Sequence, residues 1–160
     1  MSSSQQAQQQ QQQQQQKVLI TNPPSNPSLA PTYSQVSTVP LSPTKRLISF
    51  AGQTGTGPDA AENAKLSFAE QIERALEKVD KLLAATGAKK GDIVMVRPYV
   101  VKLTSRSVVE IQAKDEIYLR WWRSTEGDDA LPPPDSLLGV DSLWSKETLF
   151  EIEVQCVSDI

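Results

Sequence analysis

The acidic residues of this chain are the first candidates for chemistry, because the chain contains no histidine. Without histidine, Ser-His-Asp and Cys-His nucleophile systems are excluded, and the commonest metal ligand in proteins is missing. Proton transfer must therefore use carboxylates, lysine, tyrosine, cysteine or water. A metal site would need clustered carboxylates, which the spacing does not reveal, so we expect no metal and no cofactor.

Two groups of acids stand in positions that need an explanation. Asp135 follows three prolines and directly precedes an apolar run, in the stretch LPPPDSLLGV. Glu151 and Glu153 alternate with apolar residues in the final stretch TLFEIEVQCV. Alternation of this kind predicts a strand with its apolar side chains on one face and both glutamates on the other.

One helix is predicted clearly among the elements that must position these acids. In SFAEQIERALEKVDKLLAATG, apolar residues recur at helical spacing, which indicates a face packed on a core. Ser67 and Glu70 have the spacing of a capping box, and Gly87 is suited to the left-handed conformation that closes a helix.

The remaining elements follow from similar patterns. Strands are predicted at 46–51 and 92–103, the second with Pro98 where a ladder hydrogen bond is missing. The apolar residues of 108–122 repeat as a second helix, and Asp115 falls on the same stripe, where an acid needs a partner. Two short strands, 138–144 and 148–157, complete the chain.

This order of elements favours an α+β sandwich with a mixed sheet and both helices on one sheet face. The opposite face then carries Glu151 and Glu153. It must be exposed to water, line a cleft, or be buried against another subunit with polar partners.

The N-terminal part differs from the rest in composition. Residues 1–16 form a glutamine-rich tract, predicted to be a disordered tail, and residues 17–43 are rich in Pro, Ser, Thr and Asn, predicted to be an arm with a possible short strand near 33–36. Residues 44–160 form the expected folded domain. Targeting signals and membrane spans are not apparent, which favours the cytoplasm. The net charge of −3, without a basic cluster, makes nucleic acid an unlikely partner.

Several pieces of the sequence together resemble the YjgF/YER-type reactive-intermediate deaminases, also called RidA or L-PSP endoribonucleases. These pieces are YSQ, FAGQTG, the first helix with its following strand, DEIYLRWW, a proline before the penultimate strand, and FEIEVQCV. The resemblance covers residues 33–157. It implies a chorismate-mutase-like α+β fold and a homotrimer with a small-molecule cleft at each subunit interface.

The resemblance also implies which residues form the site. Tyr33, the Gly52–Gln53 pair and Glu151 match positions of the family pattern. Asp115 stands where the family has an asparagine, and Ala51 replaces a serine. At the position of the arginine that clamps the carboxylate of an imino acid, this chain has Asp135. A carboxylate there repels another carboxylate, which argues against the family's usual substrates.

Two interpretations of Asp135 stay open. It is either a turn residue beside a degenerate cleft, or an acid lying across the cleft from Glu151, where mutual repulsion gives one acid and one base. In the second case Tyr33 donates a hydrogen bond and Gln53 polarises a carbonyl. We therefore expect an altered-substrate deaminase, hydrolase or isomerase. The alternative is a non-catalytic trimeric binding protein, and a ribonuclease comes last.

Overall fold

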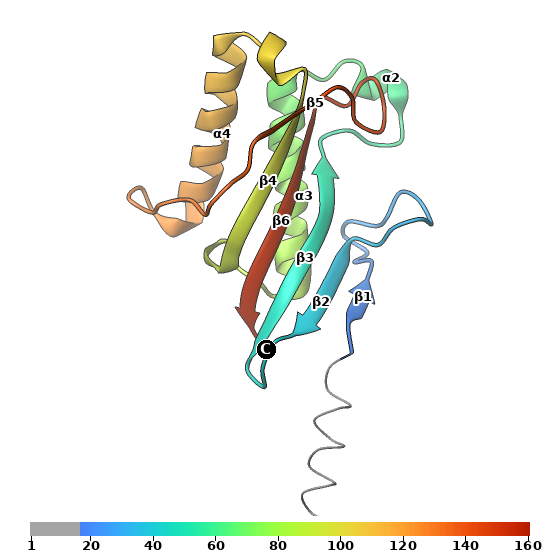
Figure 1. The fold of residues 1–160 in the computed structure, drawn as a ribbon. Helices are drawn as coiled ribbons and strands as arrows, with labels where there is room; N and C mark the ends of the chain where they lie inside the picture. The colour runs from blue at the N-terminus through green and yellow to red at the C-terminus, as the bar shows by residue number, and fades with distance from the viewer. Residues whose placement is uncertain (1–16) are drawn as a thin grey trace, which may run out of the picture.

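The computed structural model describes residues 17–160, in which a six-stranded sheet carries two long helices on one face (Figure 1). The strand order is β1-β2-β3-β6-β4-β5, and only the β4–β5 pair is parallel. The strands are β1 (Leu19–Thr21), β2 (Val36–Pro40), β3 (Lys45–Thr54), β4 (Ile93–Val101), β5 (Leu138–Val140) and β6 (Phe150–Asp159). The sheet is therefore mixed and the fold is α+β, as predicted. The tail predicted for residues 1–16 lies outside the described residues.

Helix α3 (Phe68–Thr86) has the predicted ends and the predicted buried face. Ser67 and Glu70 form the reciprocal capping box, and Gly87 adopts a left-handed conformation with φ of 73°. The apolar residues at helical spacing are all buried: Phe68, Ile72, Ala75, Leu76, Val79, Leu82 and Leu83. This face packs on β3 and β6, so α3 lies behind the centre of the sheet in Figure 1.

Helix α4 (Val108–Glu126) presents a different face to the core from the one predicted. Its buried residues are Lys114, Ile117 and Trp122, whereas Asp115 points outward with 60% of its side chain exposed. Val108, which was predicted to lie on the buried apolar face of this helix, is 72% exposed. The prediction was wrong because the aliphatic stem of Lys114 takes a core position that a count of apolar residues does not register.

The segment expected to be an arm contributes two strands to the sheet. Strand β2 pairs with β3 and begins at Val36, so the short strand expected near 33–36 lies further along the chain. Strand β1, which was not predicted, pairs with β2 and forms one edge of the sheet. The Pro-, Ser- and Thr-rich composition of the region gave no signal for β1, because pairing with β2 stabilises this strand more than its own propensity does.

Pro98 lies in β4 at a position where the lost hydrogen bond is tolerated. Val96, two residues earlier, exchanges backbone hydrogen bonds with Pro134 and Ser136. Regular pairing with β5 starts only at Tyr99, opposite Leu138. The nitrogen of Pro98 therefore faces a gap between these two contacts. Strand β5 is shorter than the predicted strand at 138–144.

Short helical segments complete the described chain: α2 (Ala60–Asn63) and two 3-10 turns, η1 (Lys90–Asp92) and η2 (Leu103–Ser105). None of the helices in residues 17–160 is long and apolar enough to span a bilayer. The core between sheet and helices contains Phe68 and Phe150 in an edge-to-face contact, with ring centroids 6.3 Å apart. Cys156, fully buried in β6, belongs to the same core.

Candidate functional site

The face of the sheet opposite the helices, here called the open face, carries the acids of β6. Phe150, Ile152 and Val154 are buried under the helices, whereas Glu151 and Glu153 alternate with them and are partly buried. In the strand register, Glu151 lies between Thr54 of β3 and Tyr99 of β4. The polar strand face predicted from the alternation is therefore confirmed.

Glu151 packs against a glycine at an irregularity in β3. The register of β3 against β6 shifts between Phe50 and Gln53, which places Ala51 and Gly52 in a bulge. A Cβ added to Gly52 would overlap the Glu151 carboxyl group. Glycine is thus required for the carboxyl group to lie over the strand, and β3 continues past it to Thr54.

Glu153 is held by two residues of β4. The Tyr99 hydroxyl donates a hydrogen bond to Glu153 Oε2 at 2.9 Å, and Arg97 Nη1 lies 3.7 Å from the same oxygen. Burial and the neighbouring Glu153 carboxylate raise the pKa of Tyr99, so the phenol keeps its proton and remains a donor. Glu153 therefore has a hydrogen-bond donor and a cation beside it.

The pKa of Glu151 is raised, mainly because burial disfavours its charged form and secondarily because Glu153 repels it. The two glutamates thus differ in environment. Glu153 has the Tyr99 phenol and the Arg97 guanidinium beside it, whereas Glu151 lies against Gly52 in the bulge and pairs with Thr54 of β3. The raised pKa makes the Glu151 carboxyl group suited to exchanging a proton.

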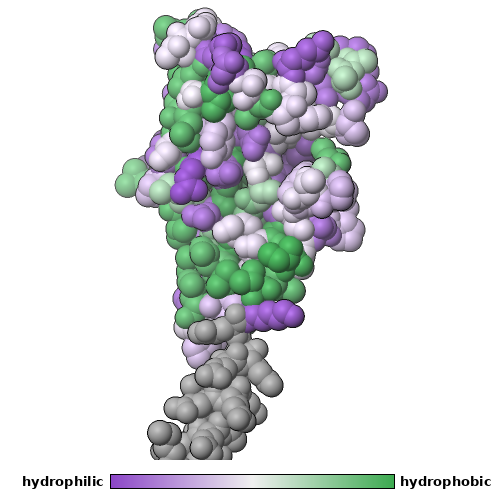
Figure 2. Space-filling model, turned by 45° about the vertical axis from the view of Figure 1, so that its right-hand side comes forward, coloured by the Kyte–Doolittle hydropathy of each residue, from purple (hydrophilic) through white to green (hydrophobic). Residues whose placement is uncertain are grey.

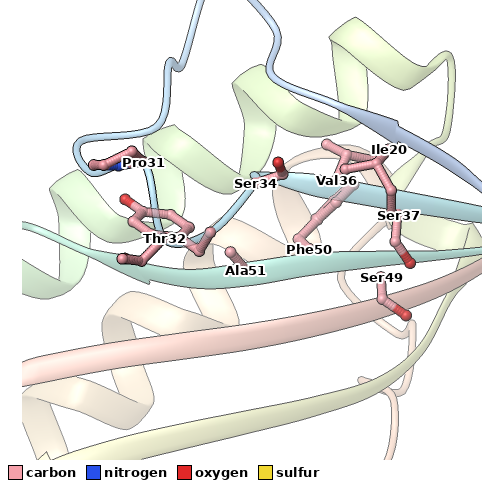
Figure 3. A pocket seen from close by; sticks show the side chains of 10 residues that line it. Ile20, Pro31, Thr32, Ser34, Val36, Ser37, Ser49, Phe50 and Ala51 are labelled. Carbon is pink, nitrogen blue, oxygen red and sulfur yellow. The ribbon is translucent and has the colours of Figure 1, made fainter.

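An open groove with a volume of about 490 Å³ lies beside the bulge, between β2, β3 and the chain that leads into β2 (Figure 3). Figure 3 shows the helices behind the sheet, so the groove is on the open face. Its lining combines apolar side chains with hydroxyl groups: Ile20, Pro31, Thr32, Tyr33, Ser34, Val36, Ser37, Ser49, Phe50 and Ala51. We call it the β2–β3 groove. Ala51 lines the groove and the next residue, Gly52, contacts the Glu151 carboxyl group, so this carboxyl group adjoins the groove beside Ala51.

Figure 2 shows apolar surface gathered at the end of the molecule where the chain enters β1. Val18, Leu19 and Ile20 are each about half exposed there, and Ile20 also lines the β2–β3 groove. The groove thus adjoins Glu151 beside Ala51 and apolar surface near the sheet edge.

Two predicted site residues, Tyr33 and Gln53, form hydrogen bonds within the chain. Tyr33 lines the groove, and its hydroxyl oxygen accepts a hydrogen bond from the Leu29 amide at 3.1 Å. Gln53 is 2% exposed; its amide accepts from Asn26 at 2.7 Å and donates to Gln35 Oε1 at 2.9 Å and to the Ala51 carbonyl. Both donor positions of Gln53 are occupied, so it fastens the segment before β2 to β3.

The structure does not bring Asp135 and Glu151 together within one subunit. Asp135 pairs with Val96, whose side chain is buried on the helix side of the sheet, and paired residues share a face. Asp135 lines a narrow crevice with Lys114 and Tyr118 of α4. Burial and the Asp135 carboxylate raise the pKa of Tyr118, while Glu151 is on the opposite face of the sheet.

Asp115 is also remote from the open face. Its carboxylate lies 2.7 Å from the Lys114 ammonium on the surface of α4. Of the predicted residues, the structure therefore brings together Gly52 and Glu151, places Tyr33 on the adjoining groove and Gln53 beneath it, and separates Asp115 and Asp135 from them. In residues 17–160 there is no cluster of three acids, cysteines or histidines able to hold a metal.

Sequence reasoning missed Arg97 and Tyr99. They occupy alternate positions in β4, between the buried Val96, Pro98 and Val100. The run IVMVRPYVV is so apolar that its period of two was overlooked, although the spacing of Arg97 and Tyr99 is a usable signal. Lys114 was missed for the opposite reason, since a charged residue is rarely counted as core.

The fold and the placement of these side chains define a chorismate-mutase-like α+β protein. Residues 24–158 match the sequence model of the family described as endoribonuclease L-PSP. The chain belongs to this family, which its solved structural neighbours name YjgF, UK114 or Rid.

Solved structures support the same fold. A Rid-family protein, YyfA from Yersinia pestis, superposes with a TM-score of 0.69 at 22% identity, covering 88% of this chain and 98% of that chain. Escherichia coli TdcF, solved with bound serine, gives 0.67 at 22% identity over 87% and 98%. Rv2704 of Mycobacterium tuberculosis, from the YjgF/YER057c/UK114 family, gives 0.58 at 22% identity over 88% and 98%. No curated protein sequence matches the chain.

Proposed function

We propose that this chain is a homotrimeric enzyme that transforms a small molecule in a cleft at the subunit interface, with Glu151 as the group that carries the proton. The observation that carries the proposal is the Glu151 carboxyl group, packed over the Gly52 bulge beside an open groove. A trimer is supported by the partly buried polar side chains of the open face, which need cover and polar partners.

The chemistry proposed is general acid and base catalysis by one carboxyl group. In the hydrolysis of a protonated imine, Glu151 accepts a proton from water while the water oxygen bonds to the imine carbon and the C=N electron pair moves to nitrogen, which gives a carbinolamine. Glu151 returns this proton to the nitrogen. The Glu151 carboxylate then takes the proton of the carbinolamine hydroxyl as the C–N bond breaks, and ammonia and a carbonyl product are released. Ammonia takes the last proton from Glu151 and restores the carboxylate. The same proton shuttle serves a hydrolase or an isomerase acting on a related substrate. Burial, and secondarily the Glu153 carboxylate, raise the affinity of Glu151 for its proton.

Ordinary 2-imino acids are not the proposed substrates. The family pattern has a carboxylate-binding arginine at the position of Asp135. In this chain the position is an aspartate that lines the crevice with Lys114 and Tyr118. The Arg97 guanidinium faces Glu153. Among the described residues at this site, no other cation is available to a substrate carboxylate, so we propose a substrate that lacks a carboxylate.

The test is imine hydrolysis measured with two sets of substrates generated in the assay. Imines without a carboxylate are produced from amines by an amine oxidase, and 2-imino acids from amino acids by an amino acid oxidase. We expect ammonia release above the buffer rate only with the first set. Glu151→Gln is expected to lose that activity by about a hundredfold or more, while Glu116→Gln on the exposed face of α4 retains it.

Two results would overturn the proposal: no acceleration of either set by a folded protein, or full activity of Glu151→Gln. A non-catalytic small-molecule-binding protein is the second candidate. It is favoured by the engagement of Gln53 and Tyr33 in contacts that hold the chain itself. Ribonuclease activity is the least supported, because the chain has a net charge of −3 and the Arg97 guanidinium on the open face is paired with Glu153.

A further inference from the structure

The β2–β3 groove and the two glutamates carry enough chemistry to name a class of ligand. We propose that the site binds a small organic cation, a primary amine or an iminium ion with an apolar substituent. Its charged nitrogen lies against Glu151, and its substituent occupies the groove. This inference rests on the site proposed above but concerns binding rather than turnover.

The groove has the size and composition for the apolar part of such a ligand. Its volume of about 490 Å³ falls within the range of small-molecule sites. Ile20 supplies exposed apolar surface, whereas Val36 and Phe50 line the groove with little of their surface exposed. Hydroxyl groups such as those of Ser37 and Ser49 supply polar contacts. The groove carries no charged side chain among its lining residues, so charge is offered only where it adjoins Glu151.

The charge there is negative. Glu151 and Glu153 lie two residues apart on the same strand face, and one cation, Arg97, faces Glu153 at 3.7 Å. The pair and Arg97 together carry a net negative charge whenever both carboxyl groups are ionised. An ammonium or iminium group placed beside Glu151 compensates this charge. It also donates hydrogen bonds to a carboxyl group that accepts none from the side chains or backbone of residues 17–160.

The other cations near this part of the fold are occupied elsewhere. Lys78 donates to the carbonyls of Thr54 and Thr56, at 2.7 and 2.8 Å. Lys114, on the helix side of the sheet, is paired with Asp115. Beside Glu151 a carboxylate ligand would therefore meet two carboxylates, whereas a cationic ligand meets an anionic site.

The structure also gives the pH dependence expected of this binding. The titratable groups around Glu151 are Glu153 on its own strand and Arg97 and Tyr99 on β4, and Tyr33 stands on the adjoining groove. The raised pKa of Glu151 means that its negative charge develops only as the pH rises above the ordinary range of a glutamate. Binding of an amine should strengthen over that interval, as long as the amine itself stays protonated.

Binding of three probes with the same aromatic body tests the proposal: benzylamine, benzyl alcohol and benzoate. Titration of the full chain by NMR or calorimetry is expected to give a dissociation constant at least about tenfold lower for benzylamine than for the other two. Benzylamine should bind more tightly at pH 8 than at pH 5.5. Glu151→Gln should abolish both the preference for the amine and its pH dependence, while Glu116→Gln on α4 leaves them unchanged.

Equal or tighter binding of benzoate, binding of none of the three probes, or an unchanged preference in Glu151→Gln would overturn the proposal. Folding of each variant is checked by circular dichroism and thermal melting. Because no bond is broken, the measurement is independent of the imine assay. An amine preference without turnover would contradict the proposed enzyme while supporting the ligand class.

Discussion

Gly52 is the residue on which the geometry of the site depends most directly. In Gly52→Ala the added methyl group overlaps the Glu151 carboxyl group, which must move off the strand. We expect loss of amine binding and destabilisation of the fold by about 1–3 kcal/mol, the usual range for overpacking. Chemical unfolding and benzylamine titration measure both effects.

Gly57→Ala is the matched control for this change. A Cβ at Gly57 meets no atom within 4 Å, and the residue lies only a few positions further along the same chain segment. This variant should bind benzylamine normally and differ little from the natural sequence in stability. Equal effects of the two substitutions would show that loss of glycine, rather than contact with Glu151, is responsible.

Glu151 should also make the stability of the protein depend on pH. Its folded-state pKa is raised from 4.5 by burial and by Glu153, so the folded state holds a proton that the unfolded state releases earlier. The resulting stabilisation is present below about pH 4.5 and is lost as the pH rises through the folded-state pKa. Glu151→Gln removes this term.

Thermal melts of the natural chain and Glu151→Gln between pH 4 and pH 8 check this expectation. The melting temperature of Glu151→Gln should exceed that of the natural chain increasingly as the pH rises across the interval. A constant difference at all pH values would mean that Glu151 titrates alike in the folded and unfolded states. Glu116→Gln, exposed on α4, should show no such trend.

At the scale of elements, Gln53 connects the strands before residue 43 to the rest of the sheet. Gln53→Ala leaves the buried amides of Asn26 and Gln35 without their partner. Each buried polar group left unpaired costs about 1–3 kcal/mol. We expect a clear loss of stability and faster hydrogen exchange of the amides in β1 and β2.

Hydrogen exchange followed by mass spectrometry distinguishes this local effect from general loosening. Exchange in α3 should change only as far as global stability changes, while β1 and β2 should exchange faster than that. Gln112→Ala, on the exposed side of α4, serves as the control. Uniform acceleration across all elements would contradict a specific fastening role for Gln53.

The elements differ in how far the sequence predicts them. Helix α3 was predicted with both ends because its periodicity, its capping box and its terminal glycine agree. The packing face of α4 was not, because Lys114 occupies a core position. Strand β1 had no local signal, since three residues at a sheet edge depend on the neighbouring strand for their stability.

The candidate site was predictable in part for similar reasons. Alternation in β6 assigned Glu151 to the open face, and the family resemblance drew attention to Gly52. The face on which Asp135 lies depends on its register with Val96, and no pattern within the stretch LPPPDSLLGV determines which residue faces it. Arg97 lies opposite Glu153 on the neighbouring strand, and this contact can be recognised only when the pairing of β4 with β6 is known.

At the scale of the whole molecule, we expect a trimer that buries the open face. Gln155 lies on this face, where its amide approaches Ser49 at 3.5 Å. Gln155→Lys would place an unpaired charge in the buried surface, so it should dissociate the trimer. Light scattering at micromolar concentration should give three times the chain mass for the natural sequence and the mass of a monomer for this variant.

The corresponding change on the helix side, Gln112→Lys, should leave the assembly intact. A monomeric natural protein would contradict the trimer and remove the interface cleft from the proposed function. A trimer that tolerates Gln155→Lys would show that the subunits meet through another surface, such as the apolar end of the molecule around β1.

Cys156, the chain's single cysteine, lies in β6 between the sheet and the helices, with none of its surface exposed. Burial raises the pKa of its thiol to about 12, so at neutral pH almost none of it is the reactive thiolate. A thiol reagent can therefore modify the protein only while the central strand is transiently exposed. The rate at which Cys156 is labelled therefore measures how often these opening events occur. A molecule that binds the native state lowers this labelling rate, even when no chemical product is formed.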